Sequence, residues 1–428
     1  MAVARKVDPA ALARLDELTL PEGGGWLRAA REDAVQRLRV SGLPQRRDEY
    51  WKYTDPTSLT AAEPPSAALF EAGEVPLFAG EGPLRAVFVD GRFDADRSDD
   101  LTAEGVEIVR LDDAAQADIH WARDLYGRLE AAGQVPVPRP LATLNSALAT
   151  DGVALRVTGR VARPIALVYL RADEGADAIL HHLVKVEEGA EVTLLETGPG
   201  AARLNTVLEA DVAAGGKLHH VRTQGRDHQR RMNTHVFARL GAESVFKTFT
   251  LSVNGRLTRN ETVVEFTGDD AVAHLAGAAV GDGEFHHDDT VFVTHDALNC
   301  ESRQVFKKVL RNGAVGVFQG KILVRQGAQK TDGYQLSQSL LLDDDSQFLA
   351  KPELEIYADD VACSHGSTSG AIDDTALFYL RSRGVPDADA KDLLVLAFLA
   401  EAIAEIEDAD IAADLVARLE AWLRRRRD

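Results

Sequence analysis

The alternation of hydrophobic and polar residues changes twice along the chain. Apolar residues recur at helical spacing in the first part, over Pro9–Leu18 and Trp26–Val40. From about Val153, short apolar runs alternate with polar residues and are separated by glycines, which is typical of strands. Helical spacing returns after Asp373. The pattern therefore predicts a strand-rich centre between two helical ends.

The segment between the first helices and the strand-rich centre has a mixed character. A basic and aromatic stretch, Arg46–Thr54, is expected to pack within the N-terminal region rather than to bind a ligand. A connector rich in proline, alanine and glycine follows, and Ala86–Phe93 predicts a β-hairpin that turns at Asp90-Gly91. We expect a helical N-terminal region over residues 1–85 and a mixed connecting region over residues 86–150.

The strand-rich centre contains a repeat of nearly constant length. A polar turn with glycine precedes an apolar strand at Gly189, Gly215, Gly241 and Gly268, with spacings of 215 − 189 = 26, 241 − 215 = 26 and 268 − 241 = 27 residues. Fixed spacing of this kind is typical of solenoids, in which each repeat buries its apolar face against the next one. We predict a mainly β fold with a β-helix over residues 151–371. A run of hairpins in a sandwich or barrel is the alternative.

The C-terminal part, residues 372–428, predicts three helices. Asp373 can cap the first helix, which ends at Gly384. The second covers about Leu393–Ile406, and the third carries an apolar face up to Leu423. We expect this helical domain to be separable from the strand-rich centre.

Composition and charge exclude several classes of function. The 428 residues include 48 Lys and Arg and 68 Asp and Glu, so the net charge is 48 − 68 = −20, which argues against nucleic acid or an anionic membrane surface as partner. We see no signal peptide and no apolar run that could span a bilayer, and therefore expect a cytoplasmic location. Cys300 and Cys363 are too few cysteines for a disulfide framework or a four-cysteine metal centre.

The sequence also lacks a phosphate-binding loop. Gly316–Lys321 has three residues between its glycines where such a loop has four, and Ile322 replaces the hydroxyl residue. We therefore expect that this chain does not bind a nucleotide.

A group of histidines suggests one metal hypothesis. Strand alternation would place His287, Asp289 and His295 on one face, together with two valines. With His286, these histidines define a β-helix or cupin-like metalloenzyme as one functional hypothesis. The two valines favour the alternative that this face is a partly buried surface.

Asp359–Gly366 brings a thiol and an imidazole close together. If the alternation of the preceding strand continues, Cys363 and His365 point outward on one accessible face. Both are metal ligands, but two ligands cannot complete a tetrahedral site, so a metal would need further groups from a partner. A buried structural cysteine beside a hydrogen-bonded histidine is the alternative, and a bulge at Asp360 would reset the register.

Several motifs occur in a characteristic order along the chain. They are Trp51–Thr54, Asn299–Gln304, Lys330–Gly333, Lys351–Val361, Cys363–Gly366 and Phe378–Gly384. In this order they resemble the SufB/SufD family, whose members are scaffold subunits of the SUF iron–sulfur cluster assembly machinery. The resemblance is closer to the SufD branch, because SufB has a His-Glu pair where this chain has His365-Gly366.

The resemblance implies a fold and a role. The implied fold is a right-handed parallel β-helix flanked by helical regions. The implied role is a non-catalytic scaffold that pairs with a SufB-like subunit through the β-helix and binds a SufC-like ATPase through its C-terminal helices. ATP-driven movement of the ATPase subunits would open the interface between the two scaffolds. A homodimer is expected when the partner is absent.

The resemblance also implies a site. His365 matches the family's interface histidine and Cys363 matches a neighbouring cysteine. A nascent cluster or iron would then be held transiently between two chains, and the nucleotide would belong to the ATPase.

Overall fold

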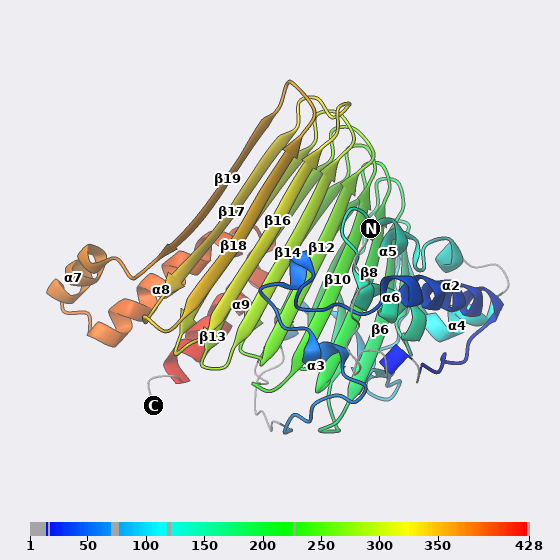
Figure 1. Ribbon diagram of the computed structural model, residues 1–428, viewed down its shortest axis with the longest axis horizontal. Coiled ribbons are helices and arrows are strands. Elements are labelled where there is room, and N and C mark those ends of the chain that lie inside the picture. The colour runs from blue at the N-terminus through cyan, green and yellow to red at the C-terminus, as the bar shows by residue number, and fades with distance from the viewer. Residues whose placement is uncertain (1–13, 16–17, 70–76, 118–120, 226–227, 426–428) are drawn as a thin grey trace.

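The computed structural model describes residues 14–15, 18–69, 77–117, 121–225 and 228–425. These residues form a right-handed parallel β-helix with helices at both ends (Figure 1), so the predicted fold class is confirmed. The helix predicted over Pro9–Leu18 falls mostly outside the described residues. The exact domain boundaries stay predictions.

Two sheets form the β-helix, and successive strands enter them alternately. Sheet A contains, in spatial order, β19 (Ala362–Gly370), β17 (Asp332–Leu341), β15 (Glu301–Arg311), β13 (Val272–Asp282), β11 (Val245–Val253), β9 (Lys217–Gln224), β7 (Glu191–Thr197), β5 (Ile165–Leu170), β1 (Leu84–Val89) and β2 (Arg92–Phe93). Sheet B contains β18 (Gln347–Ile356), β16 (Val315–Val324), β14 (His286–His295), β12 (Leu257–Phe266), β10 (Arg231–Leu240), β8 (Arg203–Val212), β6 (Asp177–Val186), β4 (Val153–Val157) and β3 (Val106–Arg110). The β1–β2 hairpin is antiparallel, as predicted, and so is the β3–β4 pair.

The strand register explains the repeat seen in the sequence. Glu191 of β7 pairs with Lys217 of β9, which gives a turn of 217 − 191 = 26 residues. Glu301 of β15 pairs with Asp332 of β17, a turn of 332 − 301 = 31 residues. The turns before β7 and β9 need positive φ, and Gly189 (68°) and Gly215 (64°) supply it. The period is therefore regular in the early turns and lengthens later.

Helices cover the outer faces of the two sheets. The N-terminal helical elements are α2 (Gly25–Ser41), η1 (Glu49–Trp51), α3 (Thr57–Thr60), η2 (Ala79–Glu81), α4 (Leu111–Gln116), η3 (Trp121–Asp124), α5 (Arg128–Ala132) and α6 (Pro140–Leu148). Most of them lie over sheet B, while α8 (Asp387–Ile403) and α9 (Ala409–Arg425) lie on the side of sheet A (Figure 1). None of the described helices is long and apolar enough to cross a lipid bilayer.

The three predicted C-terminal helices are present, but two of them belong to the main core. Val395 of α8 and Leu415 of α9 pack in one cluster with Phe249 and Val305 of sheet A. Removing α8 and α9 would expose those strand residues to water, so the expectation of a separable C-terminal domain is wrong.

The first C-terminal helix, α7 (Asp374–Ser382), is different. The Asp373 carboxylate caps it by accepting hydrogen bonds from two backbone N–H groups, as predicted. None of its residues is buried, and it projects away from the β-helix (Figure 1). Phe378 and Tyr379 are 73% and 53% exposed.

Candidate functional site

Two strand edges are open at the C-terminal end of the β-helix. In the described chain, β19 pairs only with β17 in sheet A, and β18 pairs only with β16 in sheet B (Figure 1). The backbone N–H and C=O groups along an open edge lack strand partners and favour pairing with another chain. The candidate thiol and imidazole lie on β19.

Cys363 turns toward the interior of the β-helix. Its side chain packs against a cluster that includes Ile322, and a Cβ added to Gly333 would lie 3.1 Å from its Sγ. The prediction that Cys363 points outward is wrong, because the chain turns a corner from sheet B to sheet A over residues 357–361 and strand alternation does not continue through it. Burial raises the pKa of the Cys363 thiol, which favours the protonated form.

His365 lies two residues further along β19, on the same face. In the parallel register it follows Gln335 of β17, which follows Gln304 of β15. The two glutamines are buried and joined by a hydrogen bond of 2.8 Å, whereas His365 is exposed because no further turn of the described chain stacks on it. It makes no hydrogen bond to the described residues. The imidazole and the thiol therefore share one face, as predicted, and this face is the open end of the interior.

The histidines of the metalloenzyme hypothesis do not converge. His286 faces outward and lies 2.9 Å from Thr54 Oγ1. His287 and His295 face the interior, and His295 Nε2 lies 2.8 Å from Ser302 Oγ. Among the residues that the structure describes, no three ligand atoms at metal spacing include any of them. The metalloenzyme hypothesis is therefore not favoured.

A buried ammonium group lies where a metal would have to bind beside His287. Lys308 Nζ is 2.7 Å from His287 Nδ1 and also contacts the Asp289 carboxylate. His287 Nε2 lies 2.9 Å from Ser252 Oγ, so both ring nitrogens are occupied. Burial lowers the pKa of His287 to about 3. These groups form an internal hydrogen-bond network with a neutral imidazole.

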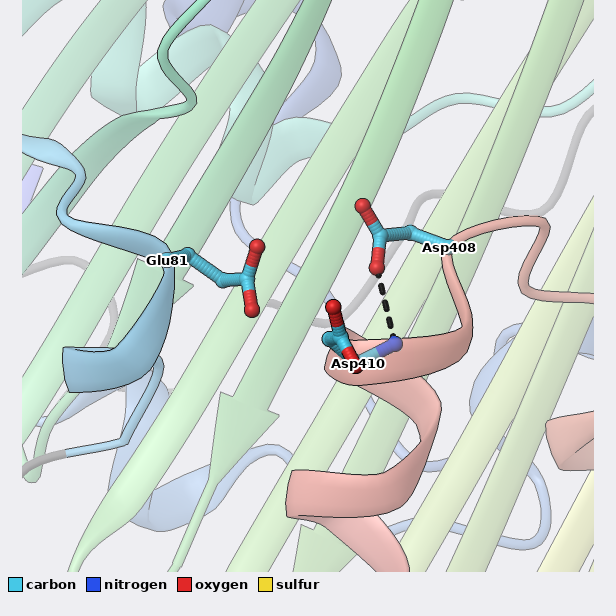
Figure 2. Close-up of side chains that lie close together, drawn as sticks. All are labelled: Glu81, Asp408 and Asp410. Carbon is cyan, nitrogen blue, oxygen red and sulfur yellow. Dashed lines mark hydrogen bonds between the residues drawn. The ribbon is translucent and has the colours of Figure 1, made fainter.

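Three carboxylates do meet at metal-ligand spacing elsewhere. Glu81, Asp408 and Asp410 carry oxygen atoms within 4.8 Å of one another, and no other such group of three occurs in the described ranges (Figure 2). Burial and the neighbouring carboxylates raise the pKa of Glu81. Asp408 and Asp410 are exposed, and acidic groups of this kind are common without an ion, so we assign none.

The basic and aromatic segment 46–54 lies against sheet B. Trp51 is buried and packs over the Arg259 guanidinium, whose carbon is 4.1 Å from the ring centroid. Tyr50 packs edge-to-face on Phe292, with ring centroids 5.1 Å apart. The expectation that this segment packs within the N-terminal region missed these contacts with the β-helix. The outward-facing Arg259 and Phe292 were the available signal, but their partner could not be read from the pattern.

Comparisons with known proteins give consistent matches. Residues 169–398 match the family model described as SUF system FeS cluster assembly, SufBD core domain. The chain is 30% identical over 399 residues to the iron-sulfur cluster assembly protein SufD of Escherichia coli strain K12, covering 90% of each chain. It is 29% identical over 417 residues to an iron-sulfur cluster assembly SufBD family protein of Synechocystis, covering 89% of this chain and 88% of that protein. Identity to the SufD of Bacillus subtilis strain 168 is 26% over 289 residues, covering 65% of this chain and 66% of that protein.

Proposed function

Because this chain belongs to the SufB/SufD family and is a SufD-like scaffold subunit for iron–sulfur cluster assembly, we propose that it pairs with a SufB-like subunit at the open edges of β18 and β19. His365 then supplies a ligand to the nascent cluster or iron at that interface, with Cys363 beside it. The observation that carries this proposal is the position of both side chains on the open end of the β-helix interior.

The open end has the properties of a subunit interface. Edge strands bind other strands through their free backbone groups. Ile356 and Tyr357, beside the edge, are 40% and 60% exposed, and a docked partner would remove this apolar surface from water. The same partner would enclose His365 and supply the ligands that one chain lacks. Without it, the same edges support a homodimer.

We also propose that α7 binds the SufC-like ATPase. The helix buries none of its own residues, and the exposed Phe378 and Tyr379 are the aromatic types that anchor protein interfaces. Nucleotide then binds to the ATPase, and movement of the ATPase subunits opens the scaffold interface. The chain itself acts without catalytic residues. Its cytoplasmic location stays a prediction.

His365→Ala tests the proposed site. His365 is exposed and makes no hydrogen bond to the described chain, so the variant should keep its folding stability and its affinity for the SufB-like subunit. Cluster assembly on the complex should fall at least about tenfold, because an interface ligand is missing. The measurements are thermal unfolding, affinity for the partner, and iron and sulfide bound by the purified complex.

Ser367→Ala is the matched control, because Ser367 lies on the same strand and bonds only to Ser337, at 2.9 Å. It should assemble clusters like the wild type. Wild-type assembly by His365→Ala, or equal loss in both variants, would contradict the assigned role of His365.

A further inference from the structure

A short N-terminal segment crosses the outer face of sheet B and ends on its last strand. This segment, residues 48–54, contains η1 and is called the strap below. Its contacts start on β12 and β14, continue to β16 through a 3.1 Å hydrogen bond from Gln319 Nε2 to the Tyr50 carbonyl, and reach β18. It therefore joins the middle of the β-helix to the open edge.

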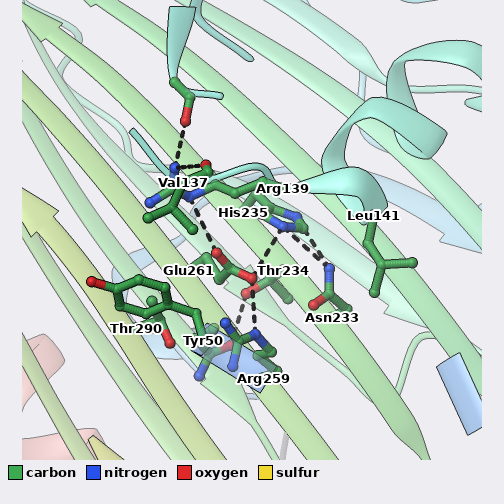
Figure 3. Close-up of polar contacts among 12 residues, drawn as sticks. Tyr50, Val137, Arg139, Leu141, Asn233, Thr234, His235, Arg259, Glu261 and Thr290 are labelled. Carbon is green, nitrogen blue, oxygen red and sulfur yellow. Dashed lines mark hydrogen bonds and ion pairs between the residues drawn. The ribbon is translucent and has the colours of Figure 1, made fainter. Parts of the chain in front are cut away.

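The inner end of the strap is anchored on buried charge. Trp51 covers Arg259, and Arg259 Nε lies 2.8 Å from Glu261, which also contacts Arg139 at 3.2 Å (Figure 3). Burial alone would raise the pKa of Glu261, but the nearby Arg259 guanidinium holds it below the usual range. Thr54 Oγ1 donates a 2.6 Å hydrogen bond to Asp288 of β14. Buried ion pairs of this kind hold their partners in a defined geometry, so this end of the strap is fixed.

The outer end of the strap makes three contacts with β18. The Tyr50 hydroxyl donates a hydrogen bond to the Glu353 carboxylate. Lys351 Nζ lies 3.9 Å from the Tyr50 ring centroid and 2.7 Å from the Glu49 carboxylate. Lys351 and Glu353 lie at the centre of β18, two residues apart on its outer face.

β18 needs such support because little else holds it. It is partly exposed along almost its whole length, whereas its neighbour β16 is mostly buried. A strand bonded on one edge opens locally at low free energy and is poorly ordered for binding. Contacts that hold it in the paired conformation reduce the entropy lost when a partner strand docks.

We infer that the strap is a brace that positions the edge strand β18 for subunit pairing. The inference rests on the proposed interface at this edge and adds Tyr50 as its positioning residue. Tyr50 is buried and does not itself reach a partner surface, so its effect on pairing passes through β18.

Tyr50→Phe tests the brace, because it removes the hydroxyl that bonds to Glu353 and keeps the ring that packs on Phe292. Binding of the SufB-like subunit of the same organism should weaken about 3- to 10-fold, the range expected for one hydrogen bond. Hydrogen exchange of the free chain should quicken by a similar factor over residues 347–356 and stay unchanged in β10. The measurements are calorimetric titration and exchange mass spectrometry.

Tyr53→Phe is the matched control, because its hydroxyl in the same strap makes no hydrogen bond within the described residues. It should bind and exchange like the wild type. Wild-type affinity and exchange in Tyr50→Phe, or equal weakening in both variants, overturns the brace. If the wild-type chain itself does not bind the SufB-like subunit, the proposed interface fails, and exchange in β18 still decides whether the strap holds that strand.

Discussion

Charged residues inside the β-helix are stabilised by one another. Lys308 is 1% exposed and contacts both Asp289 and His287. A lysine or a carboxylate left alone in such a place would lose its hydration without compensation. The pair is therefore a unit, and each member is tolerated because the other is present.

Lys308→Met tests this pairing. The variant leaves Asp289 buried without its cation, so the free energy of unfolding should fall by about 3–5 kcal/mol in urea denaturation. Adding Asp289→Asn removes the uncompensated charge and should recover part of the loss.

Lys391→Met is the control for Lys308→Met, because Lys391 pairs with Asp387 on the surface. Its loss should stay below about 1 kcal/mol. A similarly small loss in Lys308→Met would contradict the paired description of the interior.

Strand alternation predicted some side-chain directions and missed others. His287, Asp289 and His295 share one face, as expected, because β14 is uninterrupted over residues 286–295. The direction of Cys363 could not be predicted in the same way. A corner separates it from β18, and the angle of a corner depends on backbone hydrogen bonds such as the one from Lys330 N to Asp360 O.

Among the elements, α7 stands apart because it contributes nothing to the core. Phe378→Ser with Tyr379→Ser should leave unfolding unchanged within about 0.5 kcal/mol, because both side chains are already in water. Binding of the SufC-like ATPase should fall at least about tenfold, which surface-immobilised binding measurements can follow.

Val40→Ser provides the control for the α7 variant. Val40 is an exposed apolar residue on α2, remote from α7 in the chain. It should leave ATPase binding intact. Unchanged binding by the α7 double variant would place the ATPase elsewhere on the chain.

The elements themselves were largely predictable because each has a local signal. Gly189 and Gly215 mark turns of constant geometry, and Asp373 marks a helix start with its side chain. The packing of α8 and α9 on sheet A was not predictable. It depends on the match between Leu415 and strand residues such as Phe249, which lie far apart in the sequence.

For the whole molecule, buried histidines should dominate the response to acid. Burial lowers the pKa of His182 to about 4, of His287 to about 3 and of His295 to about 4. In the unfolded chain a histidine titrates near 6.5, so below about pH 6.5 the unfolded state binds protons that the folded state does not. Stability should therefore fall as the pH drops from about 6.5 toward 4.

The expected slope is about 1.4 kcal/mol per pH unit for each of the three histidines once the unfolded form is fully protonated. Urea denaturation between about pH 7.5 and pH 5 measures it. His295→Gln should reduce the slope by about one proton's share. An unchanged slope in that variant would show that His295 is protonated in the folded state.

The architecture of the whole molecule could be predicted from its repeat, but the arrangement at its open end could not. The spacing of Gly189, Gly215, Gly241 and Gly268 indicates a solenoid wherever it occurs. The contact between Tyr50 and Glu353 joins positions about 300 residues apart in the chain, and no local pattern encodes such a contact.

The two open strand edges have a consequence for how the chain is supplied in the cell. A molecule made in excess of its partner presents unsatisfied backbone groups to every other copy of itself. Synthesis in step with the partner would limit that exposure, and surplus copies would become homodimers, aggregates or substrates for proteolysis. Raising the dose of this chain alone should therefore lower its soluble fraction, and raising both subunits together should restore it.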